Sequence, residues 1–410
     1  MPGKIDRITE KAKVLEFKLK SLLELTHAIN ANRSVPDLLN LYKAVMNSEL
    51  GIDKLVLFQK NGATWTPAFQ FGIEGAPEPI KDENVFHGKQ RTALANSATG
   101  SKDAFDIVIP VYHDEIPIAY VLTGDLAEDE LGMSRAVKHM NFVQTFTNIM
   151  LVAIRNKKLA EENLRQEIVR KELELAAEMQ AILVPHELPR NDTFEVSAVY
   201  RPHQQVGGDY YDFAFLSENE FMFCVADVSG KGVSAAFLMA NFQAYLRAIF
   251  QYLQLPLEEV VRELNQRVMR SAMGEKYITF FVATYNTSTR VMQYVNCGHN
   301  PPVLVSDNDE VSFLTKGSIG LGILDSIQNI SKGVVSVEPG STLVCYTDGL
   351  VELENEANKE YGTDRLIDVV TSRNYNSMDE LNRLIMDDVN TYKGSMPYID
   401  DTALLTCRFF

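Results

Sequence analysis

The spacing of apolar residues predicts a helix in the N-terminal segment, residues 1–32. Over residues 5–32 an apolar side chain recurs at every seventh position, at Ile8, Leu15, Leu22 and Ile29. Such a repeat indicates either a coiled-coil seam or a single amphipathic helix that packs on its own domain. A polar break at Ser34, followed by Pro36, predicts that a second helix begins shortly afterwards and covers residues 38–50.

Two later segments carry the residue types of β-strands. Residues 54–72 and 105–124 each have β-branched and aromatic residues on both sides of a short polar turn. The first turn is Asn61-Gly62, a dipeptide that favours a tight hairpin, and the second lies at His113–Glu115. Each segment therefore predicts an antiparallel β-hairpin.

The order of these elements predicts a regulatory domain. A polar, loop-like stretch over 73–102 separates the hairpins, and a helix over about 134–154 is expected to close the unit. Two helices, antiparallel strands and a final helix form an α+β layout. This layout resembles that of a GAF domain over residues 20–155. The resemblance implies a sensor, and the sequence leaves open whether it binds a small molecule or a protein partner.

A charged linker helix is predicted over residues 155–185. Apolar residues lie on or near one stripe, at Ile154, Leu164, Ile168, Leu175 and Ile182. Charged residues interrupt the same stripe, at Lys157, Glu161, Lys171 and Glu178. Such a stripe is too narrow and too polar for a buried helix. It favours the seam of a parallel homodimer, with a solvated spacer helix as the alternative.

The C-terminal part, residues 186–410, alternates strand-like and helical segments. Strands are predicted over 194–202, 213–228, 278–286, 291–298, 301–307, 341–349 and 402–410. Helices are predicted over 234–253, 257–272, 361–370 and 378–392. Because strands outnumber helices and several have hairpin-length connections, the expected fold is an antiparallel β-sandwich flanked by helices. The whole chain is thus expected to be an α+β protein.

Charge and composition argue against some classes of protein. The formal net charge of −16 disfavours a nucleic-acid partner, which would require a basic face. No stretch reaches the roughly 20 apolar residues of a membrane span, and the charged N-terminus lacks the apolar core of a signal peptide. The four cysteines lie far apart in sequence, which predicts buried free thiols in a reducing compartment. These features predict a cytoplasmic protein.

Aspartates close to glycine or to each other stand out at four places in the C-terminal part. They lie in VGGDYYD (206–212), ADVSGKG (226–232), YTDGL (346–350) and the pair Asp400-Asp401. Most adjoin a strand-like run that meets a loop, where catalytic groups are common, and glycine lets the backbone approach a bound group closely. One Asp-Gly pair usually marks only a turn, so the argument rests on the four motifs together.

The residue types of these motifs point to hard divalent cations. Oxygen ligands without histidine or cysteine select Mg²⁺ or Mn²⁺ over zinc. Several carboxylates brought together repel one another unless cations neutralise them. Two such ions about 3.5–4 Å apart can clamp an in-line displacement at phosphorus and activate the attacking water. The pattern therefore predicts a two-metal phosphatase that requires no phospho-enzyme.

Taken together, the motifs resemble the PPM (type 2C-like) metal-dependent protein phosphatases, in particular the SpoIIE-type bacterial serine phosphatases. The matching segments within residues 175–410 are VGGDYYDF, ADVSGKGVSAAFLMA, NCGHNPPVL, YTDGLVE and IDDTALL. The GGD triplet also occurs in diguanylate cyclases. Here Tyr-Tyr-Asp-Phe follows it instead of Glu-Phe, which removes that alternative.

The resemblance implies a set of metal ligands and catalytic residues. Asp209 would bridge two Mn²⁺ or Mg²⁺ ions, and Asp227 would bind the second ion with help from the backbone carbonyl of Val228. Asp348 and Asp400 would complete the shell of the first ion. The expected catalytic centre is therefore formed by Asp209 and Asp227.

Other residues of the motifs have less certain roles. Asp401 and Asp212 are candidates for a metal contact or for a contact behind the ligands, and support is the favoured role of Asp212. The family pattern Asp-Asp-x-Thr is not fully met, because Ala403 stands at its last position. His299 is expected to be a turn residue rather than a catalyst, and Lys231 is expected to be solvated. No substrate-binding residue is predicted.

The expected function is that of a protein serine/threonine phosphatase in bacterial signalling, controlled by the N-terminal sensor. By the resemblance, its substrate is a phosphorylated anti-sigma-factor antagonist. Two other classes remain open: a catalytically silent dimeric signalling adaptor, and a metal-dependent phosphodiesterase or nucleotidase. The intact set of four aspartates argues against the adaptor. Nothing in the sequence specifies the base-binding pocket of a nucleotidase.

Overall fold

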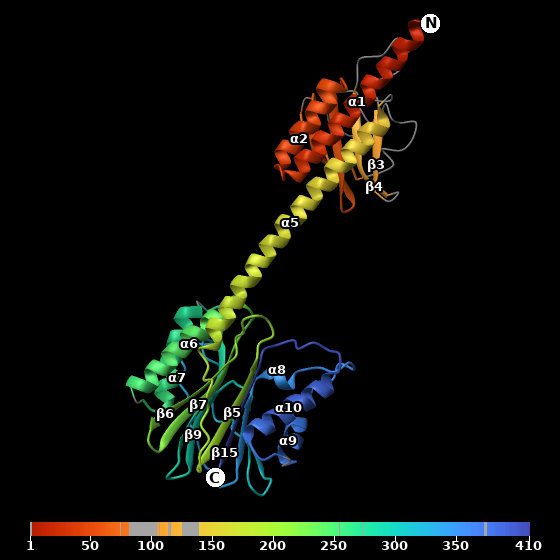
Figure 1. Ribbon diagram of the computed structural model, residues 1–410. Helices are drawn as coiled ribbons and strands as arrows, with labels where there is room; N and C mark the ends of the chain where they lie inside the picture. The colour runs from red at the N-terminus through yellow and green to blue at the C-terminus, as the bar shows by residue number, and fades with distance from the viewer. Residues whose placement is uncertain are drawn as a thin grey trace. The chain divides into compact units, whose positions relative to one another are not determined.

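The chain forms two compact units in the computed structural model, Met1–Gln166 and Glu167–Phe410 (Figure 1). The structure describes residues 2–73, 75–81, 105, 107–113, 116–124, 139–253, 255–272, 274–372 and 375–410. Three predicted features lie partly or wholly outside these residues. They are the polar stretch 73–102, the second hairpin turn at 114–115 and the start of the helix predicted over 134–154.

The N-terminal unit combines helices with a four-stranded antiparallel sheet. Its helices are α1 (Pro2–Asn30), α2 (Val35–Ala44), the π-helical turn η1 (Val45–Glu49) and the first part of α5 (Met140–Ala181). Its strands, in the spatial order β2-β1-β4-β3, are β1 (Lys54–Asn61), β2 (Thr64–Phe71), β3 (Ile107–His113) and β4 (Ile116–Gly124). Both predicted hairpins are confirmed, since β1 pairs with β2 and β3 with β4.

Local sequence explains the boundaries of these elements. Ser34 caps α2, because its hydroxyl oxygen accepts a hydrogen bond from the Asp37 N–H while the Asp37 carboxylate accepts one from the Ser34 N–H. The first hairpin turns at residues 62–63, one position later than predicted, because Asn61 still pairs with Thr64. Gly62 adopts a left-handed backbone there (φ +61°), which glycine tolerates readily.

Alternation along the strands divides the core of this unit between the two faces of the sheet. Leu55 and Leu57 of β1 join the helices in one apolar cluster. Val56 and Phe58 point to the opposite face, where they pack with Trp65 in a smaller cluster. The helices of the unit thus cover one face of its sheet.

Helix α5 runs without interruption across the boundary between the helices predicted over about 134–154 and 155–185. No glycine or proline occurs within it, so its backbone ladder has no cause to break near residue 155. Ile154 of the predicted apolar stripe packs against the core of the N-terminal unit. The other four residues are exposed in the single chain, with fractional exposures of 59% at Leu164, 50% at Ile168, 60% at Leu175 and 73% at Ile182. The dimer seam therefore stays a prediction.

The C-terminal unit is built from two largely antiparallel sheets with helices outside, as predicted (Figure 1). The five-stranded sheet has the order β11-β10-β14-β15-β5 and contains β5 (Phe194–Arg201), β10 (Val303–Val305), β11 (Val311–Phe313), β14 (Thr342–Tyr346) and β15 (Thr402–Phe409). The six-stranded sheet has the order β12-β9-β8-β7-β6, with β13 beside β9. It contains β6 (Tyr210–Ser217), β7 (Glu220–Val228), β8 (Ile278–Asn286), β9 (Val291–Cys297), β12 (Gly317–Ser318) and β13 (Gly333–Ser336).

The helices of this unit lie close to their predicted positions. They are α6 (Val233–Tyr252), α7 (Leu257–Ala272), α8 (Asp348–Val351), α9 (Thr363–Thr371) and α10 (Met378–Lys393). Helices α6 and α7 pack on the six-stranded sheet, and α9 and α10 pack on the five-stranded sheet. The short helix α8 differs from the prediction, which continued the preceding strand to residue 349.

Strand β14 shows how alternation builds two cores in this unit. Leu343 and Cys345 belong to the apolar cluster that includes residues of both sheets, whereas Val344 and Tyr346 face α9 and α10. The four cysteines, Cys224, Cys297, Cys345 and Cys407, are buried and free, as predicted.

Among the helices that the structure describes, α6 is the one whose length and apolar content would suffice to cross a membrane. Six of its apolar residues are buried, at Ala235, Leu238, Met239, Phe242, Leu246 and Ile249. Packing on β6 and β7 accounts for this composition in a folded domain.

Candidate functional site

The six-stranded sheet places Asp209 opposite Asp227. Tyr210 at the start of β6 pairs with Ala226 of β7, so the neighbouring positions, 209 and 227, face each other across the ladder. Besides burial, the charge of Asp227 raises the pKa of Asp209, which indicates that the two carboxyl groups lie close together. Asp209 is only 1% exposed, so its carboxyl group points into the protein.

The five-stranded sheet brings Asp348 close to Asp400 and Asp401. Strands β14 and β15 pair as far as Tyr346 and Leu404. Asp348 begins α8 just beyond β14, and the acidic pair stands just before β15. The antiparallel register thus gathers the third and fourth motifs at one edge of this sheet.

Thr347 connects the two groups of aspartates across the sheets. Its hydroxyl donates to Oδ2 of Asp209 at 2.7 Å, and its oxygen accepts a hydrogen bond from the Ala403 N–H at 2.8 Å. Sequence reasoning missed Thr347, although it stands directly before Asp348.

Two glycines of the motifs permit close approaches of the backbone. A Cβ atom on Gly208 would lie 2.9 Å from the carbonyl oxygen of Val228. A Cβ atom on Gly349 would lie 1.9 Å from the carbonyl oxygen of Asp401. Any larger residue at either position would therefore push apart the loops that carry the aspartates.

Burial and mutual repulsion raise the pKa values of three of the four aspartates, and burial is the main cause for each. Proximity to Asp227 adds to the rise in the pKa of Asp209, which lies well above its usual range. Asp348 and Asp400 help to raise the pKa of Asp227 to about 7. Asp400 is likewise the second cause of the raised pKa of Asp348. The carboxyl groups are thus close enough to repel one another when charged.

Lys231 is exposed to solvent, as predicted, and its side chain also contacts Asp400. Its Nζ atom lies 2.8 Å from Oδ2 of Asp400 and also donates to the carbonyl oxygen of Ile399. The two side chains keep 42% and 38% exposure, so the ion pair is accessible to an incoming cation. The combined negative charge of Asp400 and the neighbouring carboxylates attracts the ammonium group of Lys231.

The donor set fits hard divalent cations by its chemistry. Among the described residues, no three His, Cys, Asp or Glu side chains lie close enough together to hold a metal ion in the arrangement seen here. The argument for cations therefore rests on the chemistry of the donors. The available donors are carboxylate oxygens and the Val228 carbonyl, which Mg²⁺ and Mn²⁺ prefer. Burial and the neighbouring carboxylates raise the pKa values of Asp209 and Asp227, and a bound cation would favour their charged forms.

Asp401 holds the loop in front of Asp209. Its Oδ1 accepts the N–H of His203 at 2.7 Å, and its Oδ2 accepts the N–H of Gly208 at 2.6 Å. Both oxygens are therefore used by backbone amides. This geometry favours the supporting role over a metal contact.

Asp212 lies on the face of β6 that α6 covers. Its fully buried carboxylate accepts hydrogen bonds from Nε and Nη2 of Arg247 at 2.8 and 2.7 Å, and another from the Tyr210 hydroxyl. This set of contacts attaches α6 to the sheet. Asp212 thus has the supporting position that the sequence favoured, and Arg247 is a partner that sequence reasoning missed.

His299 has the contacts of a turn residue, as predicted. Its backbone N–H donates to Oδ1 of Asn296 at 2.8 Å, and its Nδ1 lies 2.9 Å from the Thr279 hydroxyl. Burial lowers the pKa of the imidazole to about 4, so the ring is neutral near pH 7.

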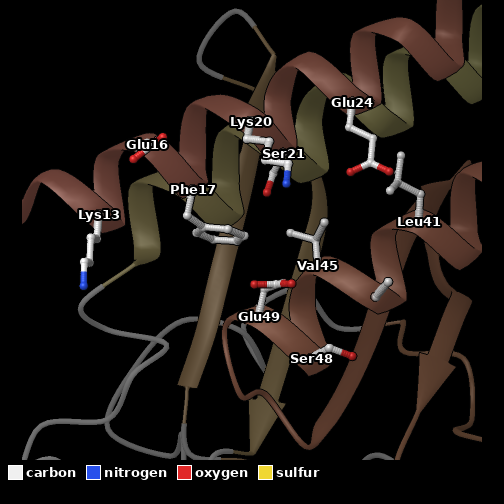
Figure 2. A pocket seen from close by; sticks show the side chains of 11 residues that line it. Lys13, Glu16, Phe17, Lys20, Ser21, Glu24, Leu41, Val45, Ser48 and Glu49 are labelled. Atoms are coloured by element: carbon white, nitrogen blue, oxygen red, sulfur yellow. The ribbon is translucent and has the colours of Figure 1, made fainter. Parts of the chain in front are cut away.

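A separate groove lies in the N-terminal unit between α1 and the α2–η1 segment (Figure 2). Its volume of about 440 Å³ falls within the range of small-molecule sites. Phe17 points into it from α1. Its charged lining residues are Lys13, Glu16, Lys20, Glu24 and Glu49. Because both signs are mixed on exposed side chains, the groove defines no single class of ligand.

The fold of the C-terminal unit is that of PP2C-type phosphatases. The PP2C domain of SiaA from Pseudomonas aeruginosa matches with a TM-score of 0.53 at 21% sequence identity, covering 60% of this chain and 99% of the matched chain. The antiparallel β-sandwich with outer helices, expected from the resemblance, is therefore confirmed as a PP2C-like fold.

Residues 217–410 match the family model of Stage II sporulation protein E (SpoIIE). Protein IcfG of Synechocystis sp. is 22% identical over 333 residues, which is 73% of this chain and 52% of IcfG. Phosphoserine phosphatase RsbU of Bacillus subtilis is 28% identical over 192 residues, which is 47% of this chain and 56% of RsbU. The chain thus spans about half the length of these relatives.

Proposed function

We propose that this chain is a metal-dependent protein serine/threonine phosphatase of a bacterial signalling pathway. The observation that carries the proposal is the convergence of Asp209, Asp227, Asp348 and Asp400 from two sheets. Similarity to the phosphoserine phosphatases RsbU and RsbP of Bacillus subtilis supports a substrate that carries phosphoserine or phosphothreonine. The proposed substrate is a regulatory phosphoprotein of the anti-sigma-factor antagonist type.

The proposed ligands divide between two Mn²⁺ or Mg²⁺ ions. Asp209 would contribute to both ions, Asp227 and the Val228 carbonyl to one, and Asp348 and Asp400 to the other. When bound, such ions supply charge neutralisation for the phosphoryl oxygens and activation of the attacking water. The mutual pKa shifts of the carboxyl groups support this assignment, because they identify the groups that a cation would stabilise in the charged form.

Neighbouring residues prepare the carboxylates for this role. Thr347 orients Asp209 through its hydrogen bond to Oδ2, and Asp401 holds the loop that precedes Asp209. Lys231 has to release Asp400 when that carboxylate binds a cation. The lysine then becomes available to other anions at the edge of the site.

The remainder of the proposal concerns regulation. The proposed domains are an N-terminal helix (1–32), a GAF-like sensor (20–155), a coiled-coil linker (155–185) and the phosphatase domain (186–410). The helix-covered antiparallel sheet of the first unit supports the sensor. The exposed stripe on α5 supports a homodimer, and the four free thiols support a cytoplasmic location.

The test is Mn²⁺-dependent hydrolysis of p-nitrophenyl phosphate by the full chain. We expect Asp209→Asn to lower the rate at least about 100-fold, because it removes a charge that both ions share. Asp192→Asn, the same exchange at an exposed aspartate, serves as the control and should leave the rate unchanged.

Full activity of Asp209→Asn would contradict the proposal. So would a folded wild-type protein without activity in excess Mn²⁺. That second result, combined with a dimeric chain, would favour the catalytically silent adaptor.

A further inference from the structure

Gln180, at the end of α5, makes two hydrogen bonds with a single residue of the VGGD motif. Its Nε2 donates to the carbonyl oxygen of Gly207 at 2.6 Å, and its Oε1 accepts the Gly207 N–H at 3.1 Å. Gln180 is only 8% exposed, and both bonds are buried. An amide side chain that pairs with both polar groups of one residue fixes the position and the orientation of that backbone.

Gly207 lies two residues before Asp209, in a loop that is held from two directions. Besides Gln180, which pairs with Gly207, Asp401 accepts the N–H of the next residue, Gly208, at 2.6 Å. A Cβ atom on Gly207 would lie 2.2 Å from the Tyr200 hydroxyl and 2.7 Å from Oδ2 of Asp401. The loop therefore has little room to shift in that direction.

The chain that follows Gln180 is attached to the same region. The carbonyl oxygen of Leu183 accepts a hydrogen bond from Gln243 of α6 at 3.4 Å. The carbonyl oxygen of Pro185 accepts one from the Tyr211 hydroxyl of β6 at 3.2 Å. The end of α5 is thus tied to α6, to β6 and to the loop that leads to Asp209.

We propose that Gln180 is a positioning residue of the candidate metal site, which transmits the position of the end of α5 through Gly207 to Asp209. The inference rests on the proposed function. Gln180 touches no reacting atom and acts through the loop backbone. A rotation or shift of α5 that withdrew its amide would leave a buried N–H and a buried carbonyl without partners. The loop would then move, and the geometry around Asp209 would change with it.

The test uses Gln180→Met in the full chain. Methionine removes both hydrogen bonds but retains a similar side-chain length and helix preference. Gln166→Met is the matched control, since it makes the same exchange at an exposed position of the same helix. Gln180→Ala removes the same two hydrogen bonds without the bulk of methionine, and it provides a second variant if Gln180→Met does not fold.

Two readouts are needed. The first is amide hydrogen exchange of residues 203–210 in metal-free protein, followed by mass spectrometry. The second is Mn²⁺ binding measured by electron paramagnetic resonance, together with kcat at saturating Mn²⁺.

We expect Gln180→Met to speed up exchange in 203–210 roughly tenfold and to raise the half-saturating Mn²⁺ concentration by a similar factor, because two buried polar groups lose their partner. We expect kcat at saturating Mn²⁺ to stay within about twofold, since the ligands themselves are intact. A shift of the same sign is expected for Gln180→Ala, and none for Gln166→Met.

Unchanged exchange in folded Gln180→Met protein would overturn the positioning role. A lower melting temperature with an unchanged half-saturating Mn²⁺ concentration would also overturn it, because it would show a purely structural contact. Wild-type protein that binds no Mn²⁺ would overturn the proposed function instead. Exchange at 203–210 would then still report whether Gln180 holds the loop.

Discussion

Asp209 and Asp212 stand three positions apart in one motif and have different surroundings. Side chains alternate along an extended segment, so an odd spacing directs them to opposite faces. Asp209 meets Thr347 of the other sheet, whereas Asp212 meets Arg247 of α6. At the scale of single residues, the odd spacing thus places Asp209, a candidate metal ligand, and Asp212, which anchors a helix, on opposite faces.

The buried imidazole of His299 predicts a pH dependence of stability. Its pKa is about 4 in the folded protein, against an ordinary value of about 6.5, so the folded chain binds fewer protons than the unfolded chain between these values. The contribution of His299 to stability is complete above about pH 6.5 and is lost as the pH falls towards 4. The difference amounts to about 3 kcal/mol.

Urea unfolding between pH 7 and pH 4.5 measures this effect. His299→Gln should flatten the decline in the free energy of unfolding, since glutamine does not titrate. His186→Gln, an exchange at an exposed histidine, is the control and should retain the parental slope. An equal slope in all three proteins would contradict the prediction.

At the scale of elements, the Arg247–Asp212 pair fixes α6 to β6. Arg247→Met would leave a fully buried carboxylate without its cation. Breaking such pairs typically costs roughly 3–5 kcal/mol. We expect a loss of about 2 kcal/mol in the free energy of unfolding, because the Arg247 side chain is 46% exposed and Tyr210 still donates to Asp212.

The matched control is Arg262→Met on α7. Arg262 pairs with Glu259 at the surface, where both partners are well exposed, so its removal should cost less than about 1 kcal/mol. Denaturant titration of the two variants compares the pairs directly. Equal losses would show that burial of Asp212 does not decide the strength of its ion pair.

At the scale of the whole molecule, the stripe on α5 predicts a homodimer. Replacing Ile168 and Leu175 together by glutamate should convert the dimer to a monomer, because charges at two seam positions cannot be buried. Val169→Glu introduces the same charge beside the stripe, at a residue with similar exposure of 48%, and should remain dimeric.

Light scattering coupled to size exclusion gives the mass of each species. A monomeric wild-type chain would contradict the predicted seam. A double variant that stays dimeric would also contradict it, because the dimer interface would then lie elsewhere.

Most elements follow from the periodicity of the sequence. The alternation of apolar residues in β14 and their helical spacing in α7 indicate which side chains are buried. The predicted positions of these two elements therefore agree with the structure. The prediction was wrong where a boundary depended on a specific contact. The strand predicted to reach residue 349 gives way to α8. The helical pattern predicted on both sides of residue 155 forms the single helix α5.

The four acidic motifs and their likeness to SpoIIE-type phosphatases can be recognised from the sequence alone, because each motif is a short, contiguous run. The contacts behind them depend on the tertiary structure. Thr347 reaches Asp209 across 138 positions, and Asp401 reaches His203 across 198 positions. Gln180 meets Gly207 only because α5 ends beside that loop. No local pattern encodes such pairs, since they arise when two sheets and a helix pack together and bury polar groups that require partners.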